Sequence, residues 1–197
     1  MSNSWGLSIL IHPVPADLNN DMTITNSILV AAIERQFPGA VQSHGEPYGM
    51  LTLETTREQI IDILRFVQES PELQVNFLTS LCGMHFPADP GRELGVVYHL
   101  HSFRHNLRFR IKVFFSSDDP YCPTATVLWP AANWMERQEY DFFGIQFTGH
   151  PDLRRILNVD DLDVFPMRKE YRLEDGTRTD KDDRAFGRQG HEGQEFD

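Results

Sequence analysis

Two groups of residues have the types and spacing that metal binding or acid–base catalysis requires. The first is a run of histidines, His99, His101 and His105, in the stretch LGVVYHLHSFRH. Residues two apart on a strand share one face, and a His-x-His pair can bind zinc or iron. No acidic residue lies on the same stretch, so other ligands, such as His150, would have to come from elsewhere. Imidazoles that face solvent or a partner are the simpler interpretation.

The second group is acidic and lies in NWMERQEYDFFG, where Glu136, Glu139 and Asp141 fall within two helical turns. Paired carboxylates can act as a general acid and base when their surroundings separate their pKa values. However, Arg137 lies among them, and Glu136 with Glu139 is an ordinary (i, i+3) pair. Such intrahelical pairs are worth only about 0.2–0.5 kcal/mol. The same turns also carry the aromatic residues Trp134, Tyr140, Phe142 and Phe143. Aromatic residues interleaved with arginines and acids are typical of interface hot spots.

Two basic clusters follow in segments without a periodic pattern: Arg154 with Arg155, and Arg168 with Lys169. Between and beside them are prolines and spaced apolar residues, namely Leu153, Ile156, Leu157, Phe165, Met167, Tyr171 and Leu173. An extended segment of this kind could lie as a strap across another subunit. Its arginines could then pair bidentately with carboxylates of that partner.

Composition narrows the class of protein. The 197 residues are 40% hydrophobic and 11% aromatic, enough for one domain with an extension. The net charge of -11 argues against nucleic acid or an anionic membrane as the main partner. No apolar run reaches the ~20 residues of a membrane-spanning helix, and the first residues do not resemble a secretory signal.

The two cysteines, Cys82 and Cys122, are widely separated. An iron–sulfur cluster needs about four thiolates, so this chain cannot hold one by itself. The same pair gives no disulfide framework and fits a reducing compartment. Glycine-rich dinucleotide or phosphate loops and the HExxH zinc motif are absent from the sequence.

The chain must position these residues on a small set of elements. Apolar spacing predicts helices over 25–37 and just after Thr56, the latter beginning with a capping box of Thr56 and Gln59. Alternation predicts a strand over 50–54 and a hairpin of strands 94–103 and 107–115. The stretch 73–82 could be strand or helix.

A short strand over 125–128 is expected next, followed by a helix from Pro130 to Phe143 that Gly144 ends. The prediction is therefore an α+β fold: a small mixed or antiparallel sheet carrying two to three helices, followed by an extended irregular C-terminal arm. Its parts are an N-terminal arm at 1–22, the α+β domain at 23–147, and straps with a charged tail at 148–197. The tail has too few large apolar residues to order itself in isolation.

The stretches WPAANWMERQEYDFFGIQFTGHPDLRRIL (129–157) and FPMRKEYRL (165–173), with the upstream strand GVVYHLHSF, resemble the 30 kDa (C) subunit of NADH:quinone oxidoreductase, respiratory complex I. The resemblance covers about residues 25–173. The matching residues are Glu136, Arg137, Glu139, Asp141, Gly144, Ile145, Phe147, Gly149, His150, Pro151, Asp152, Arg154, Arg155, Pro166, Arg168, Lys169 and Tyr171. Departures include Val164-Phe165 for Gly-His, Met167 for Leu, Glu170 for Asp, Arg172 for Pro and Asn158 for an apolar residue. They bear on the contacts of the second strap, not on the family.

The resemblance implies a non-redox subunit of the peripheral arm, at the cytoplasmic face of the inner (plasma) membrane. FMN, iron–sulfur clusters and quinone would belong to partner subunits. The partners implied are the 49 kDa (D) subunit and the cluster-bearing B subunit, and other peripheral-arm subunits could also contact the chain. The residues expected at these interfaces are Trp134, Glu136, Arg137, Glu139, Asp141, Phe143, His150, Asp152, Arg154, Arg155, Arg168, Lys169 and Tyr171.

Three other functions stay open. Relatives of the family occur in energy-converting hydrogenases and other related complexes, so the electron donor is not fixed by the resemblance. A stand-alone metal enzyme would use His99, His101 and His150. A regulatory module would associate only loosely with larger partners.

Overall fold

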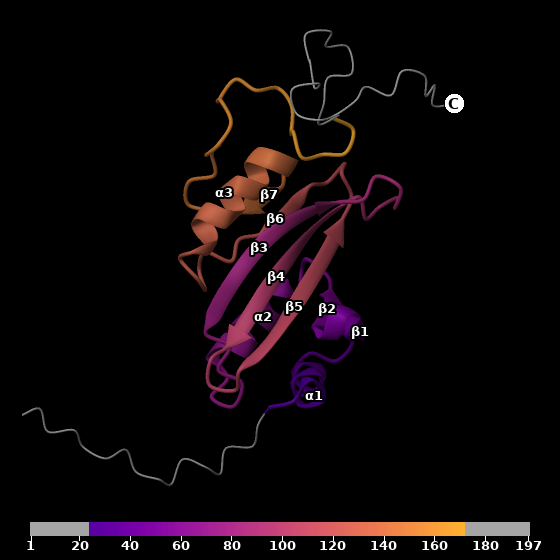
Figure 1. Cartoon of the computed structure of the whole chain (residues 1–197), viewed down its shortest axis with the longest axis vertical. Helices are drawn as coiled ribbons and strands as arrows, with labels where there is room; N and C mark the ends of the chain where they lie inside the picture. The colour runs from indigo at the N-terminus through magenta and orange to yellow at the C-terminus, as the bar shows by residue number, and fades with distance from the viewer. Residues whose placement is uncertain (1–23, 172–197) are drawn as a thin grey trace, which may run out of the picture.

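A five-stranded mixed sheet forms the centre of the fold in the computed structural model, which describes residues 24–171 (Figure 1). Its strands are β1 (Val41–Gly45), β2 (Leu51–Thr55), β3 (Phe77–His85), β4 (Leu94–Ser102) and β5 (Leu107–Phe115), in the order β1-β2-β5-β4-β3. β2 and β5 are parallel, and all other neighbours are antiparallel. The predicted hairpin is confirmed, because β4 and β5 pair from Leu94 with Phe115 to Ser102 with Leu107.

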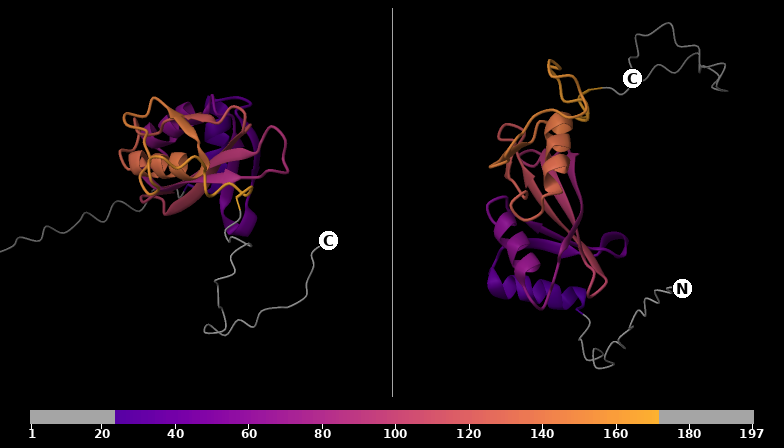
Figure 2. Two further views of the ribbon diagram at one scale, coloured as in Figure 1. Left: turned by 90° about the horizontal axis from the view of Figure 1, so that it is seen from above. Right: turned by 90° about the vertical axis from the view of Figure 1, so that its left-hand side faces the viewer.

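Two helices cover one face of this sheet, α1 (Asn26–Gln36) and α2 (Ile60–Glu69) (Figures 1 and 2). α1 begins where the Thr25 hydroxyl accepts the backbone N–H of Ile28, which satisfies one unpaired donor of the first turn. A short 3-10 helix, η2 (Pro47–Gly49), joins β1 to β2.

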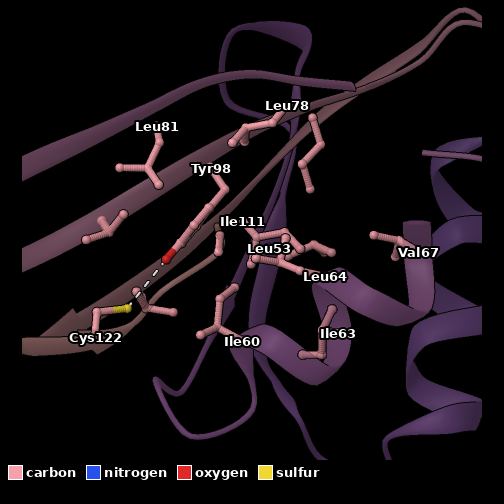
Figure 3. Packing of buried hydrophobic residues seen from close by; sticks show 14 of the residues in the cluster. Leu53, Ile60, Ile63, Leu64, Val67, Leu78, Leu81, Tyr98, Ile111 and Cys122 are labelled. Atoms are coloured by element: carbon pink, nitrogen blue, oxygen red, sulfur yellow. Dashed lines mark hydrogen bonds between the residues drawn. The ribbon is translucent and has the colours of Figure 1, made fainter. Parts of the chain in front are cut away.

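The core lies between these helices and the strands and is apolar and fully buried. α2 contributes Ile60, Ile63, Leu64 and Val67, which pack toward Leu53 and Ile111 of the sheet (Figure 3). Burying a side chain of this size contributes about 1.5–3 kcal/mol. Tyr98 adds the one polar contact drawn in this region, with its hydroxyl 3.4 Å from the Cys122 Sγ (Figure 3). Burial raises the pKa of Cys122 to about 12, so its thiol stays protonated.

The remaining elements form the other end of the molecule (Figure 1). They are β6 (Tyr121–Pro123), α3 (Ala132–Phe143) and β7 (Gln146–Thr148), with β6 and β7 paired in parallel. α3 packs along β3, an edge strand of the large sheet. Edge strands leave unpaired backbone groups, and covering them with a helix is one way to protect them.

Two local predictions were wrong. Residues 125–128 form a turn, not a strand, because the Ala125 N–H bonds to a side chain of α3 rather than to a strand partner. α2 begins at Ile60 with no side-chain cap, and the Gln59 N–H bonds to the Thr56 carbonyl instead of forming a capping box. The ambiguous 73–82 stretch forms β3 from Phe77 onward.

After β7 the chain is irregular, as predicted: residues 149–171 form no helix or strand. We call this segment the C-terminal arm. It runs over the end of α3 (Figure 1). The predicted N-terminal arm at 1–22 and the charged tail beyond 171 lie outside the described residues. Among residues 24–171, none of the helices is both long and apolar enough to cross a membrane.

Candidate functional site

The predicted acidic group lies on α3 and is buried by the chain itself. Gly144 ends the helix in a left-handed conformation, φ 74°, and its N–H bonds to the Tyr140 carbonyl. This C-cap directs the chain back so that the C-terminal arm can pass across the last turn of α3. The ring of Phe165 lies directly over Gly144, since a Cβ built there would be 2.5 Å from the nearest ring carbon.

Asp141 is the centre of the contact between α3 and the C-terminal arm. Its side chain is fully buried. One carboxylate oxygen accepts the backbone N–H groups of Ile156, Leu157 and Asn158 at 3.1, 2.8 and 2.9 Å. The other accepts the Arg155 guanidinium at 2.7 Å and the Asn158 amide at 3.0 Å. Burial alone would raise the pKa of Asp141, but these hydrogen bonds outweigh it and hold the pKa well below its usual range.

Two arginines complete this attachment. The Arg155 guanidinium also donates to the carbonyls of Leu162 and Val164, so it organises the arm beyond its own position. Arg137 projects from α3 and donates to the carbonyls of Arg154 and Arg155, both at 3.2 Å. Arg137 therefore holds the arm to the helix through backbone carbonyls, whose positions carry no sequence signal. Arg155 is held to the helix through the Asp141 carboxylate, and its bonds to Leu162 and Val164 shape the arm itself.

Glu136 and Glu139 do not pair with each other but hold α3 to two different segments. Glu136 accepts the Thr124 hydroxyl at 2.5 Å and the Ala125 N–H at 2.6 Å. Glu139 accepts the Gly83 N–H of β3 at 2.7 Å. Burial raises the pKa of each carboxyl to about 7, and these hydrogen bonds oppose that rise. The perturbed pKa values thus have a structural cause.

Three surface hollows of the described chain are lined by residues other than these acids. The one of about 420 Å³ is lined by Thr55, Arg57, Arg92, Phe114 and others. Its lining contains neither Glu136 nor Glu139. General acid–base chemistry requires the carboxyl to reach a substrate, and both groups instead contact backbone N–H groups.

The histidines are not brought together as a metal site. His99 and His101 lie on β4, while His105 bonds to the Glu72 carbonyl at 2.8 Å. His150 lies beside α3, where its Nδ1 accepts the Asp152 N–H and its Nε2 can therefore donate to the Asn133 carbonyl. Within the described part of the chain, no group of three or more His, Cys, Asp or Glu side chains is placed to hold a metal ion.

The other residues expected at an interface divide by exposure. Trp134, Asp152, Arg154, Lys169 and Tyr171 are exposed. Arg168 is half-buried and donates to the Phe143 carbonyl at 2.8 Å, satisfying one of the free carbonyls at the end of α3. The exposed members can contact a partner without rearrangement of the arm.

Several contributing residues were not predicted from the sequence. Thr124 and Gly83 bind the two glutamates, and His85 accepts the Lys169 N–H at 2.9 Å, which fixes the far end of the arm. Gly83 carried a signal, since glycine within a strand often marks a close approach of another segment. A Cβ there would lie 2.6 Å from Glu139 and from the Phe143 ring.

Ionisation of the two glutamates should make the fold less stable as pH rises. Both pKa values stand at about 7, above the ordinary 4.5, so the folded chain holds these protons more tightly than the unfolded chain. The two protonated carboxyls therefore contribute fully to the free energy of unfolding below about pH 4.5. This contribution, up to ~3 kcal/mol for each carboxyl, is lost as pH rises through about 7.

Urea unfolding at a series of pH values checks this. Glu136→Gln and Glu139→Gln each remove one titrating group and should flatten the decline between pH 4.5 and 7. An unchanged slope in both variants would contradict the assignment.

Comparisons with known proteins agree with the motif on α3 and the arm. Residues 53–177 match the family model described as "Respiratory-chain NADH dehydrogenase, 30 Kd subunit". The chain is 40% identical over 153 residues to the C 2 subunit of the NADH-quinone oxidoreductase of Rhizobium meliloti (strain 1021), covering 77% of this chain and 82% of that protein. It is 41% identical over 154 residues to the C subunit of the Roseiflexus castenholzii enzyme, covering 77% and 87%.

Two solved structures share this fold. A trypsin-resistant fragment (1-134) of Nqo5 matches with a TM-score of 0.55 and 30% identity, covering 64% of this chain and 98% of the fragment. A chain of the archaeal membrane-bound sulfane sulfur reductase matches with a TM-score of 0.62 and 24% identity over 75% of this chain and 85% of that one, which shows a shared fold. The resemblance read from the motif is confirmed. The chain belongs to the family of the respiratory-chain NADH dehydrogenase 30 kDa subunit, the C subunit of NADH–quinone oxidoreductase.

Proposed function

We propose that this chain is a non-redox structural subunit of the peripheral arm of a proton-translocating NADH:quinone oxidoreductase. In this role it packs on the 49 kDa (D) subunit, next to the cluster-bearing B subunit, at the cytoplasmic face of the membrane. FMN, the iron–sulfur clusters and quinone lie in those partners. The names of the relatives, which are C subunits of NADH-quinone oxidoreductases, support the complex and the reaction.

The structural role is supported by the contacts that the charged residues of α3 and the arm make. The buried acids and arginines bind this chain's own backbone and one another, which supports a role in positioning a surface. That surface is rich in the side chains found at interfaces. Large apolar residues of α3 and the arm stay exposed: Trp134 61%, Leu157 63%, Val159 65% and Met167 49%. Burial of such exposed apolar side chains against a partner would stabilise association.

A related complex with another electron donor is the alternative, favoured only by the shared fold with the sulfane sulfur reductase chain. Purification of the complex from membranes distinguishes the two, because co-eluting NADH-binding and flavin subunits would identify the donor.

The assembly role predicts that Trp134→Ala and Arg154→Glu lower the yield of assembled complex. Both side chains are exposed, Arg154 by 69%, so the isolated chain should unfold at the same urea concentration. Loss of an interface anchor costs about 1–2 kcal/mol or more, which lowers assembly roughly tenfold or further. NADH:quinone reductase activity should fall in the same proportion.

Glu34→Gln on the exposed side of α1 is the matched control and should leave assembly unchanged. Normal assembly of the Trp134 and Arg154 variants together with lost turnover would overturn the structural role and indicate direct participation in the reaction.

A further inference from the structure

The large sheet has a second face, which no helix of the described chain covers (Figures 1 and 2). Side chains alternate along a strand, so residues next to the buried core positions of β4 and β5 point the other way. On this uncovered side lie His99, His101, Arg108, Arg110 and Lys112. We call these five residues the open face.

The open face concentrates positive charge in an acidic chain of net charge -11. Arg108 lies opposite His101 in the ladder and Arg110 opposite His99, so both directly opposed pairs join a cation to an imidazole. The Arg110 guanidinium donates to the Thr52 hydroxyl at 2.7 Å, which fixes its position.

Within the described residues, the three cations of the open face form no ion pair. Among residues 24–171, no carboxylate lies within ion-pair distance of Arg108, Arg110 or Lys112. Glu54 lies opposite Lys112 in the register, but it already pairs with Arg92 at 2.6 Å. Arg108, Arg110 and Lys112 occupy alternate positions of β5 and so share one face, where an anionic group from outside would meet all three cations.

The imidazoles give an independent sign of an outside partner. The His99 Nδ1 and the His101 Nε2 are both buried and have no hydrogen-bond partner among the described residues. His101 as a whole is only 7% exposed. Buried polar atoms in folded proteins nearly always have a hydrogen-bond partner. A hollow of about 240 Å³ opens beside His99, with Arg108 and Ser80 also on its wall.

An aromatic patch borders the open face. Phe103 packs against His101, with ring centroids 4.5 Å apart, and against Phe77 at 5.2 Å. Phe77 and Phe103 are nevertheless 43% and 59% exposed. A partner that covers the open face would therefore bury an apolar edge beside the cations.

We propose that the open face binds an acidic segment of a neighbouring protein subunit, with an Asp or Glu side chain entering the hollow between Arg108 and His99 and apolar side chains covering Phe77 and Phe103. A protein is favoured over nucleic acid or an anionic membrane, because the net charge of the chain repels extended polyanions. The inference rests on the proposed function only in that the chain works inside a complex. It does not depend on whether the arm contacts the D subunit.

Lysine chemistry on the purified complex tests this directly. Lys112 should react with a small acetylating reagent about tenfold more slowly in the complex than in the isolated chain, because a partner covers its amine. A carbodiimide, which joins an amine only to a carboxylate in contact with it, should link Lys112 to an Asp or Glu of another subunit.

Equal reactivity of Lys112 in both states, or a link only to Glu54 of the same chain, overturns the proposal. Protection without a cross-link to another subunit also overturns it, and recovery of reactivity after lipid removal would identify a membrane instead. If the chain elutes alone from membranes, the proposed function fails with it. If it elutes in the complex with Lys112 freely reactive, only this inference fails.

Charge reversal at Arg108 provides a second test. Arg108→Glu should lower the fraction of chain recovered in the complex about tenfold, since it places a like charge against the acidic segment. Arg108→Lys should keep most of the binding. Arg65→Glu makes the same charge change on an exposed position of α2, on the helix-covered side, and should have no effect. Equal losses for Arg108→Glu and Arg65→Glu would overturn the proposal.

Discussion

Replacing Asp141 by alanine should detach the C-terminal arm from α3 and lower the free energy of unfolding by about 3–5 kcal/mol. The carboxylate is fully buried and accepts the Arg155 guanidinium together with three consecutive backbone N–H groups. Without it, a guanidinium that is only 11% exposed has no anionic partner. Leaving one member of a buried ion pair unpaired is among the most costly single changes.

Urea unfolding and limited trypsin digestion measure the two parts of this effect. Trypsin should cut the variant within the arm, at Arg154, Arg155 or Arg168, well before it cuts the wild-type chain. Asp152→Ala is the control, because its pair with Arg154 is exposed and worth about 0–1 kcal/mol. Similar destabilisation in both variants would show that the Asp141 network is not what holds the arm.

Gly144→Ala should be the second most damaging change, by about 2–4 kcal/mol. At φ 74° any L side chain is strained, which costs of order 1–2 kcal/mol. The new Cβ would also lie 2.5 Å from the Phe165 ring, and overpacking adds about 1–3 kcal/mol. The guanidiniums of Arg155 and Arg168 lie over the same ring, at 5.5 and 4.9 Å, so moving it disturbs them as well.

Gly49 provides a matched comparison, because its φ is 73° and a Cβ there would meet nothing within 4 Å. Gly49→Ala should therefore show the backbone strain alone. The difference between the two variants in urea unfolding measures the contact with Phe165. Combining Gly144→Ala with Phe165→Ala should cost less than the sum of the single changes. Equal effects at Gly49 and Gly144, or strict additivity, would refute the packing argument.

The sequence was informative where a local rule decides the structure. The β4–β5 hairpin and α3 with its Gly144 cap follow from periodicity and from the conformational freedom of glycine, so both were predicted. β1, β6 and β7 were missed because they are short and have little alternation, and their pairing with other strands defines them. The strand expected at 125–128 failed because Glu136, eleven residues later, takes the Ala125 N–H.

The candidate site was likewise predicted only in part. Motif resemblance found the acids and arginines of α3 and the arm, and it found the family. It did not reveal that Asp141 binds Arg155 and three backbone N–H groups of its own chain, because contacts to an irregular backbone leave no pattern in residue type or spacing. Docking of the exposed members on the D subunit stays a prediction.

The sheet order has a consequence for biosynthesis. The β1–β2 hairpin joins the β3–β4–β5 meander through a single parallel ladder, between β2 and β5. That seam cannot close until residue 115 has left the ribosome, although the first hairpin and both covering helices emerge much earlier. During this interval Leu51 and Leu53 of β2 lack their neighbours Phe109 and Ile111, so this edge of the core stays open until β5 is synthesised.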